Sequence, residues 1–218
     1  PNSKIALLYP ENFYGYYISK IIDSIAAKSK SLIINRSSYK EDLTDARISI
    51  KKLSKYESRK KEIDRQKKIL KNKNDEFSKN ALKKIKDFDT AGNVEFTHII
   101  IPDYSIRLLQ IVSLLPFYDV DPAKIQFVGT GVWDEKIFFN EPALQGAIFS
   151  GIEKKKREYF FNSYEEIYQN KPIRTATIPY DLIGIMSYMM EEKMTLREAH
   201  LLLDSGNIKF DGIDGKFY

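Results

Sequence analysis

The sequence contains no cysteine, only two histidines and no long apolar run. Without cysteine there can be no disulfide, no thiolate zinc site and no cysteine nucleophile. His98 and His200 lie far apart and fit no zinc-binding spacing, so we expect neither a metal site nor a bound cofactor. No apolar run approaches the ~18 residues of a membrane-spanning helix. The chain starts at Pro1 with neither methionine nor a signal peptide, so we interpret it as a piece of a longer protein.

The overall composition is typical of one folded domain. The 218 residues are 43% hydrophobic and carry a net charge of +5, and a domain of that size hides roughly 70% of its surface. Lysine is concentrated between residues 51 and 86, which hold 13 of the 27 lysines, but acidic residues such as Glu57, Glu62 and Asp64 are interleaved there and aromatic residues are few. Phosphate contacts need uncompensated positive charge on one face, so we predict no nucleic-acid binding.

Short apolar runs and helical patterns alternate along the chain. Such runs of four to eight residues, bounded by turn residues, indicate buried strands. We predict strands over Lys4–Tyr9, Ser31–Asn35, Thr97–Ile101, Lys124–Val128 and Gly146–Phe149. The alternation predicts an α/β fold, namely a mostly parallel five-stranded sheet with helices on both faces.

Two helical regions depart from this alternation. Residues 41–90 are highly charged and have sparse apolar positions, so we predict two or three helices that project as a hairpin. The C-terminal part is helical over Glu153–Tyr168, Ile178–Met190 and Thr195–Leu203, and Thr195 with Glu198 forms a capping box. Residues 207–218 are expected to form short strands or loops. The whole chain is therefore expected to be a single α/β lobe over 1–218, with an insertion at about 41–90 and a helical return segment at about 175–218.

Catalytic motifs are weak. Gly129-Thr130-Gly131 follows a strand, but Trp133 and Asp134 stand where a dinucleotide-binding loop needs small residues. Neither a phosphate-binding loop nor a GxSxG nucleophile elbow is present. Asp103 and Asp134 follow strands and could act together as acid and base, could bind a polar ligand, or could cap the next helix. We expect each histidine to be a partly buried polar side chain, and the chain not to be an enzyme.

Ligands of parallel α/β sheets bind beyond the carboxyl ends of the strands. In this sequence those ends are Tyr9-Pro10, Asn35-Arg36, Pro102-Asp103-Tyr104 and Gly129-Thr130-Gly131. Hydroxyl groups and one carboxylate at such ends could hold the charged groups of a small molecule. Trp133 could wall the pocket, or it could be an aromatic side chain that closes the loop after the fourth strand.

Several segments resemble a known family. IALLYPENFYG followed by SLIINRSSY is similar to type I periplasmic binding proteins, the fold of the leucine/isoleucine/valine receptors. FDTAGNVEFTHIIIPD, LLPFYDVDPAKIQFVGTGVWDE, NEPALQGAIFS, IRTATIPYDLIGIMSYM and FDGIDGKFY resemble the penicillin-binding protein activators of alphaproteobacteria. The resemblance implies a fold of two lobes with a cleft between them. It also implies that this chain is the second lobe and that the N-terminal lobe is missing.

The resemblance further implies a binding site and a function. Matched ligand-contacting positions are Tyr14, Asp103, Tyr104, Thr130 and Trp133. The implied function is non-catalytic regulation of peptidoglycan synthesis by contact with a penicillin-binding protein, with the helical insertion as the contact surface. The alternative is a substrate-binding receptor of an amino-acid-type ABC transporter that takes a small polar ligand. The implied location is the periplasm, with the full-length protein anchored to the outer membrane as a lipoprotein. The apolar helix at 178–190 would pack on the missing lobe, and otherwise it would be exposed or buried in a homodimer.

Overall fold

The computed structural model describes residues 3–29, 32–73, 75–206 and 208–217. Its chain divides into two compact units, each of which packs mainly within itself. The first, called the sheet unit below, comprises Pro1–Thr130 and Lys136–Phe149. The second, called the helical unit, comprises Gly131–Glu135 and Ser150–Tyr218.

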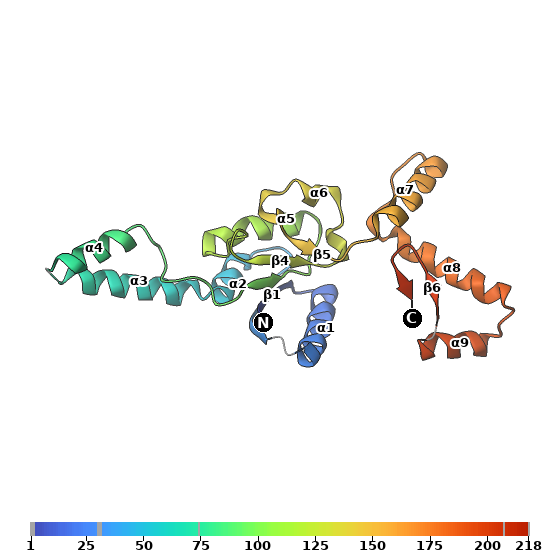
Figure 1. Cartoon of the computed structure of the whole chain (residues 1–218), viewed down its shortest axis with the longest axis horizontal. Helices are drawn as coiled ribbons and strands as arrows, with labels where there is room; N and C mark the ends of the chain where they lie inside the picture. The colour runs from blue at the N-terminus through green and yellow to red at the C-terminus, as the bar shows by residue number, and fades with distance from the viewer. Residues whose placement is uncertain (1–2, 30–31, 74, 207, 218) are drawn as a thin grey trace. The chain divides into compact units, whose positions relative to one another are not determined.

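The sheet unit is built on five parallel strands (Figure 1). They are β1 (Lys4–Pro10), β2 (Leu32–Tyr39), β3 (His98–Ile100), β4 (Gln126–Gly129) and β5 (Ile148–Phe149). Their order is β2-β1-β3-β4-β5, so the chain changes direction across the sheet between β1 and β3. This order confirms the predicted α/β fold with a five-stranded parallel sheet. In such sheets the change of direction opens a crevice at the carboxyl ends of the strands.

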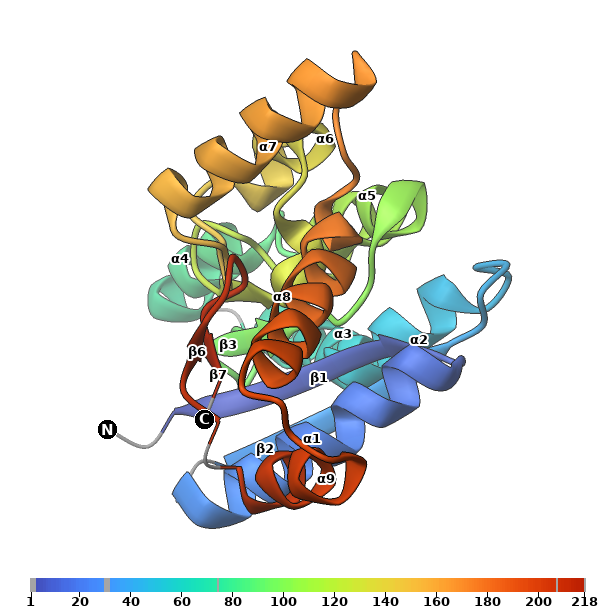
Figure 2. The same ribbon diagram turned by 90° about the vertical axis from the view of Figure 1, so that its right-hand side faces the viewer.

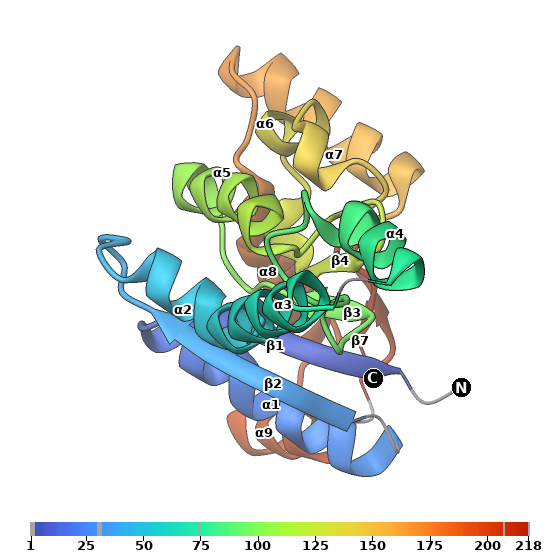
Figure 3. The ribbon, with the colours of Figure 1, turned by 90° about the vertical axis from the view of Figure 1, so that its left-hand side faces the viewer.

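Helices cover both faces of this sheet. The helices of the sheet unit are α1 (Phe13–Ser29), α2 (Ala46–Leu53), α3 (Tyr56–Lys71), α4 (Glu76–Ile85), α5 (Ser105–Leu114) and α6 (Lys136–Phe139), with 3₁₀ turns η1 (Leu115–Tyr118) and η3 (Pro142–Leu144). Helix α1 lies on one face of the sheet, and α2 and α5 lie on the other (Figures 1 and 3). The inner strand β1 is therefore covered on both sides, and its Ala6, Leu7 and Leu8 have no exposed surface. A continuous apolar run is what such a strand requires.

The charged insertion forms α2 and a hairpin of α3 and α4, which projects away from the sheet (Figures 1 and 3). The side chain of Asp75 accepts a hydrogen bond from the Ser78 amide and thereby caps α4. Of α3, only Ile63 is fully buried. The three helices agree with the two or three predicted for this region.

The helical unit has its own small core of buried side chains, and Figure 2 shows the helices of this unit from the side of α8. Its elements are η2 (Gly131–Trp133), α7 (Lys154–Tyr168), η4 (Arg174–Ala176), α8 (Thr177–Glu191), α9 (Leu196–Ser205) and the antiparallel pair β6 (Phe210–Asp211) and β7 (Lys216–Phe217). Ile185, Met189 and Ile208 form the buried cluster. The predicted capping box of Thr195 and Glu198 is present at the start of α9.

One side of α8 is uncovered in this chain. Ile183, Met186 and Met190 are 64%, 61% and 77% exposed. Helix α8 thus has more apolar side chains than the helical unit buries.

None of the helices in the described ranges combines the length and apolarity needed to cross a bilayer.

The structure differs from the sequence analysis at two points. Strand β2 runs to Tyr39 instead of ending at Asn35, because its backbone stays paired with β1 up to Pro10. It does so as an edge strand, where polar side chains can face water. His200 is exposed and pairs with Asp204 at 3.2 Å, so it is not partly buried as predicted. The predicted strand start Ser31 and the tail positions Asn207 and Tyr218 lie outside the described residues.

Candidate functional site

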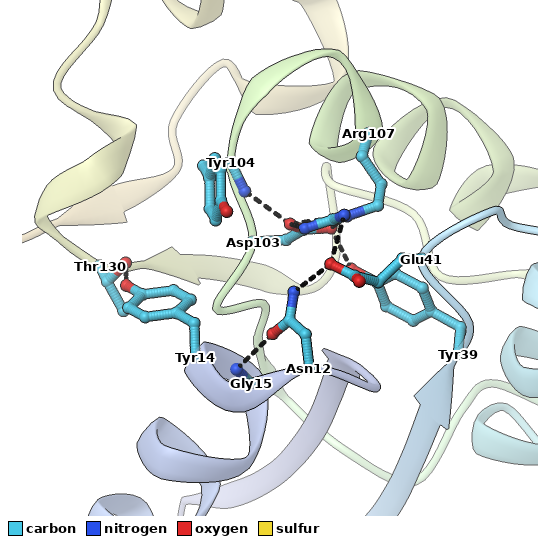
Figure 4. Close-up of polar contacts among 9 residues, drawn as sticks. All are labelled: Asn12, Tyr14, Gly15, Tyr39, Glu41, Asp103, Tyr104, Arg107 and Thr130. Carbon is cyan, nitrogen blue, oxygen red and sulfur yellow. Dashed lines mark hydrogen bonds and ion pairs between the residues drawn. The ribbon is translucent and has the colours of Figure 1, made fainter. Parts of the chain in front are cut away.

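Four of the five predicted site residues lie together at the carboxyl edge of the sheet (Figure 4). Tyr14 comes from the first turn of α1, Asp103 and Tyr104 follow β3, and Thr130 follows β4. The Tyr14 hydroxyl lies 2.6 Å from Thr130 Oγ1. The rings of Tyr14 and Tyr104 meet edge to face, with centroids 5.9 Å apart. Residues 116 positions apart in sequence are thus joined at the edge where ligands of this architecture bind.

The start of α1 places Tyr14. Asn12 Oδ1 accepts a hydrogen bond from the Gly15 amide at 2.9 Å and so caps the helix. A Cβ atom on Gly15 would lie 2.1 Å from the Pro10 carbonyl oxygen. Glycine therefore allows α1 to begin directly against the end of β1, and this close approach brings Tyr14 over the sheet edge.

Asp103 is fully buried, and its carboxylate is held on all sides by this chain. Arg107 donates to both oxygens at 2.7–3.0 Å, and the Tyr39 hydroxyl donates to Oδ2 at 2.5 Å. The backbone amide of Tyr104 also donates to Oδ1 at 2.8 Å. The residue at the capping position of α5 is Tyr104, which makes no side-chain capping bond. Asp103 therefore holds Tyr104 and Arg107 in place at the carboxyl edge of the sheet. It is not the residue that caps α5, which was one of its predicted roles.

Further residues extend this network toward the surface. Arg107 Nη1 donates to Glu41 Oε1 at 3.1 Å, and Asn12 Nδ2 donates to the same oxygen at 2.6 Å. The guanidinium of Arg107 also lies over the Tyr104 ring, 5.5 Å from its centroid. The result is one connected polar set that reaches from α1 and the end of β2 to α5.

The sequence analysis missed Tyr39, Glu41, Asn12 and Arg107. Tyr39 and Glu41 were missed because β2 was predicted to end four residues too early. Arg107 carried a usable signal, since it follows Asp103 by four positions at the start of a predicted helix, and oppositely charged residues at that spacing meet. The capping role of Asn12 could have been found from its position just before α1.

The buried network shifts the pKa values of its members. Burial first, and then the nearby Asp103 charge, raise the pKa of the Tyr39 hydroxyl far above its ordinary value. The hydrogen bond to Asp103 raises the pKa of Arg107. Burial also raises the pKa of Tyr14, against the opposing hydrogen bond with Thr130. Both tyrosine hydroxyl groups therefore stay protonated and neutral at any physiological pH.

The Tyr39 shift predicts a pH-dependent contribution to stability. An unfolded tyrosine loses its proton above about pH 10, whereas Tyr39 in the folded chain keeps it. The contribution is present below pH 10 and is lost as the pH rises further, by up to about 1.4 kcal/mol per pH unit. Tyr39→Phe should cost about 1.5–3 kcal/mol near neutrality because it removes a bond to a buried carboxylate. Denaturant unfolding from pH 7 to 12 measures the difference in unfolding free energy between the unsubstituted chain and Tyr39→Phe. This difference should become smaller above pH 10, and a constant difference would contradict the raised pKa of Tyr39.

The fifth predicted residue, Trp133, belongs to the helical unit, in turn η2, and is 1% exposed. That burial is what the alternative of a loop-closing aromatic side chain expects. Asp134 beside it is 4% exposed and pairs with Arg157 and Arg174 of the same unit. Asp103 and Asp134 thus belong to different units, and each carboxylate is paired with arginine of its own unit.

A pocket of about 220 Å³ opens in the sheet unit at the root of the helical hairpin. The residues that line it include Asn35, Ser54, Arg59 and Asn93. Within the described residues, no group of three or more histidine, aspartate or glutamate side chains is placed to hold a metal ion.

Comparison with known proteins bears on the fold. No protein-family model matches the sequence, and no curated protein matches it significantly. A solved type 1 periplasmic binding protein from Bordetella pertussis Tohama I aligns with 99% of this chain and 53% of its own length, at 11% identity and a TM-score of 0.53. An ABC transporter substrate-binding protein from Desulfitobacterium hafniense, solved in complex with Leu, aligns at 13% identity over 99% of this chain and 52% of its own, with a TM-score of 0.47.

The chain has the α/β fold of one lobe of a type I periplasmic binding protein, with its five-stranded parallel sheet. It spans about half the length of the solved structures that it matches. At these identities the likeness extends to the fold alone.

Proposed function

We propose that this chain is the ligand-contacting lobe of a substrate-binding receptor for a small polar molecule, such as an amino acid or a short peptide. The observation that carries the proposal is the contact of Tyr14 with Thr130 at 2.6 Å, beside the half-exposed ring of Tyr104. These groups offer hydroxyl hydrogen bonds and an aromatic wall at the edge where parallel sheets bind ligands. The type I periplasmic-binding-protein fold supports this placement.

In this proposal the residues of the edge have different tasks. Tyr14, Tyr104 and Thr130 contact the ligand, whereas Asp103 positions Tyr104 and Arg107 from below because its oxygens are already occupied. Glu41 is the exposed acidic group of the network and is available to a ligand's ammonium group. Trp133 is buried within the helical unit and is not among the ligand-contacting residues of this proposal. The protein would act without catalysis, in the periplasm, and in its full-length form as an outer-membrane lipoprotein.

The proposal is tested by titrating the isotope-labelled 218-residue chain with individual L-amino acids and dipeptides. Amide resonances of residues 12–15, 103–105 and 130 should shift with one compound class, even at the weak affinity expected of half a cleft. Tyr14→Phe and Thr130→Val should each weaken binding about fivefold to tenfold, the worth of one hydrogen bond. Tyr17→Phe, an exposed tyrosine of the same helix, should leave the affinity unchanged. Shifts that avoid the carboxyl edge for every compound would overturn the proposal.

A second proposal follows the finer resemblance to the penicillin-binding protein activators. It is favoured by the occupied ionic groups of the edge, because Asp103 and Arg107 satisfy each other and leave little to hold an amino acid's carboxylate. In this function the lobe regulates a peptidoglycan synthase by protein contact. A pull-down with the full-length protein should then recover a penicillin-binding protein, while the ligand titration gives no shifts at the edge. Recovery of no synthase beside a working positive control would count against it.

A further inference from the structure

Charge is distributed very unevenly along this chain. Residues 51–86, which include α3 and α4, hold fifteen lysine or arginine residues and five acidic residues, hence ten net positive charges. The whole chain carries only +5, so everything outside this segment is net negative. Electrostatic attraction of an anionic partner would therefore be concentrated on the projecting hairpin.

The acidic residues of the hairpin do not neutralise it. Glu57 is bound to Lys51 at 2.8 Å, Glu62 to Arg65 at 2.9 Å, and Asp75 caps α4. The remaining lysines are exposed and, within the described part of the chain, have no carboxylate within ion-pair distance. They are Lys60, Lys61, Lys68, Lys71, Lys73, Lys79, Lys83, Lys84 and Lys86.

On α3 these lysines share one side. A helix turns by about 100° per residue, so Lys60, Lys61, Lys68 and Lys71 fall within roughly 100° of arc, away from the buried Ile63. The interleaved acids that led us to predict a compensated face therefore leave a mainly basic one, whose two carboxylates are Asp64 and Glu57, and Glu57 is paired with Lys51.

Large apolar side chains are exposed near the tip of the same hairpin. Phe77, at the start of α4, is 82% exposed, and Ile69, near the end of α3, is 44% exposed. The α3–α4 turn lies at the end of the hairpin farthest from the sheet (Figure 1). Lysines flank both residues: Lys68 and Lys71 beside Ile69, and Lys79 beside Phe77.

Hydrogen bonds and an ion pair fix the base of the hairpin to the rest of the sheet unit. Arg59 Nη2 donates to Asp119 at 2.8 Å, and Arg59 Nη1 donates to Thr90 and to the Gly92 carbonyl. Lys67 donates to the Phe88 carbonyl at 2.7 Å. The root is therefore fixed, and the exposed tip is presented away from the sheet.

We propose that the tip of the α3–α4 hairpin docks on a lipid bilayer that contains anionic lipids. Basic side chains around a few exposed apolar ones are the combination that binds such surfaces, since charge attracts and the apolar groups enter the headgroup region. Nucleic acid fits less well. Binding to single strands relies on several stacking aromatic residues, and the tip offers Phe77 alone.

The test is co-sedimentation of the 218-residue chain with lipid vesicles. The chain should bind vesicles of mixed phosphatidylcholine and phosphatidylglycerol and should bind phosphatidylcholine vesicles poorly. Added salt should release the chain from the anionic vesicles. Each lysine at an anionic surface is worth about fivefold in affinity, so Lys68→Glu with Lys71→Glu should weaken binding by about 25-fold or more. Lys20→Glu with Lys136→Glu makes the same change in net charge outside the hairpin and should have a much smaller effect.

A second variant separates lipid from other polyanions. Phe77→Ala should weaken vesicle binding several-fold while circular dichroism and thermal unfolding stay unchanged, because the side chain is almost fully exposed. Three results would overturn the proposal: no binding to anionic vesicles, equal loss in both charge-reversal pairs, or double-stranded DNA bound as tightly as vesicles with no effect of Phe77→Ala. The outcome is independent of whether a small ligand binds at the carboxyl edge.

Discussion

Asp103→Ala is expected to lower the free energy of unfolding of the sheet unit by about 3–5 kcal/mol, the cost of breaking a buried ion pair from one side. The substitution removes the buried counter-charge of the Arg107 guanidinium, which keeps only the exposed Glu41 as an acidic partner, and it removes the acceptor of the Tyr39 hydroxyl. Urea unfolding followed by circular dichroism measures the loss. The single tryptophan, Trp133, belongs to the helical unit, so its fluorescence reports that unit separately.

Glu41→Ala is the matched control, because Glu41 pairs with the same arginine. Its side chain is 55% exposed, so losing that pair should cost about 1 kcal/mol or less. If the two variants lost similar stability, the buried network would not have the importance that its geometry suggests. A small effect of Asp103→Ala alone would lead to the same conclusion.

Gly15→Ala is the second large effect, and its sign is opposite to what helix propensity predicts. Alanine normally stabilises a helix relative to glycine by up to about 1 kcal/mol. Here the added Cβ would collide with the Pro10 carbonyl oxygen, an atom of the backbone that cannot rotate away. Overpacking of this kind typically costs about 1–3 kcal/mol, and the displaced helix would carry Tyr14 away from Thr130. Unfolding experiments should therefore show destabilisation, together with weaker binding of any ligand at the carboxyl edge.

Ser24→Ala tests the propensity argument on the same helix. Ser24 is exposed in α1, so alanine there should be neutral or slightly stabilising. If Gly15→Ala also stabilised the chain, the close approach of α1 to β1 would not be a real constraint.

The fold could be predicted from the sequence because the middle of its inner strands is buried on both faces. A strand segment covered by helices on both sides must be apolar, as residues 6–8 of β1 are, and such runs stand out from their surroundings. Tyr14 was predicted as a site residue by the resemblance to the periplasmic binding proteins, and Thr130 by that resemblance and by its place after a predicted strand.

The rest of the site could not be read from local pattern. Tyr39 and Asp103 are 64 positions apart, and only the register between β1 and β2 determines that they meet. The end of β2 is polar, and an edge strand gives no apolar signal where it faces water. Whether Arg107 pairs with Asp103 likewise depends on the direction of the Arg107 side chain. The spacing of four residues allows this ion pair but does not determine it.

The hydrogen bond between Tyr39 and Asp103 joins the end of β2 to the segment that follows β3, and these two strands are not neighbours in the sheet. Strands β2 and β3 flank β1, so the bond reaches over the end of β1 and ties its two neighbours to each other. A slip of β2 by one residue would turn Tyr39 to the other face and break this bond at once. The hydrogen bond between Tyr39 and Asp103 therefore favours the native register of β2 on β1, because it forms only when the two strands are paired in that register.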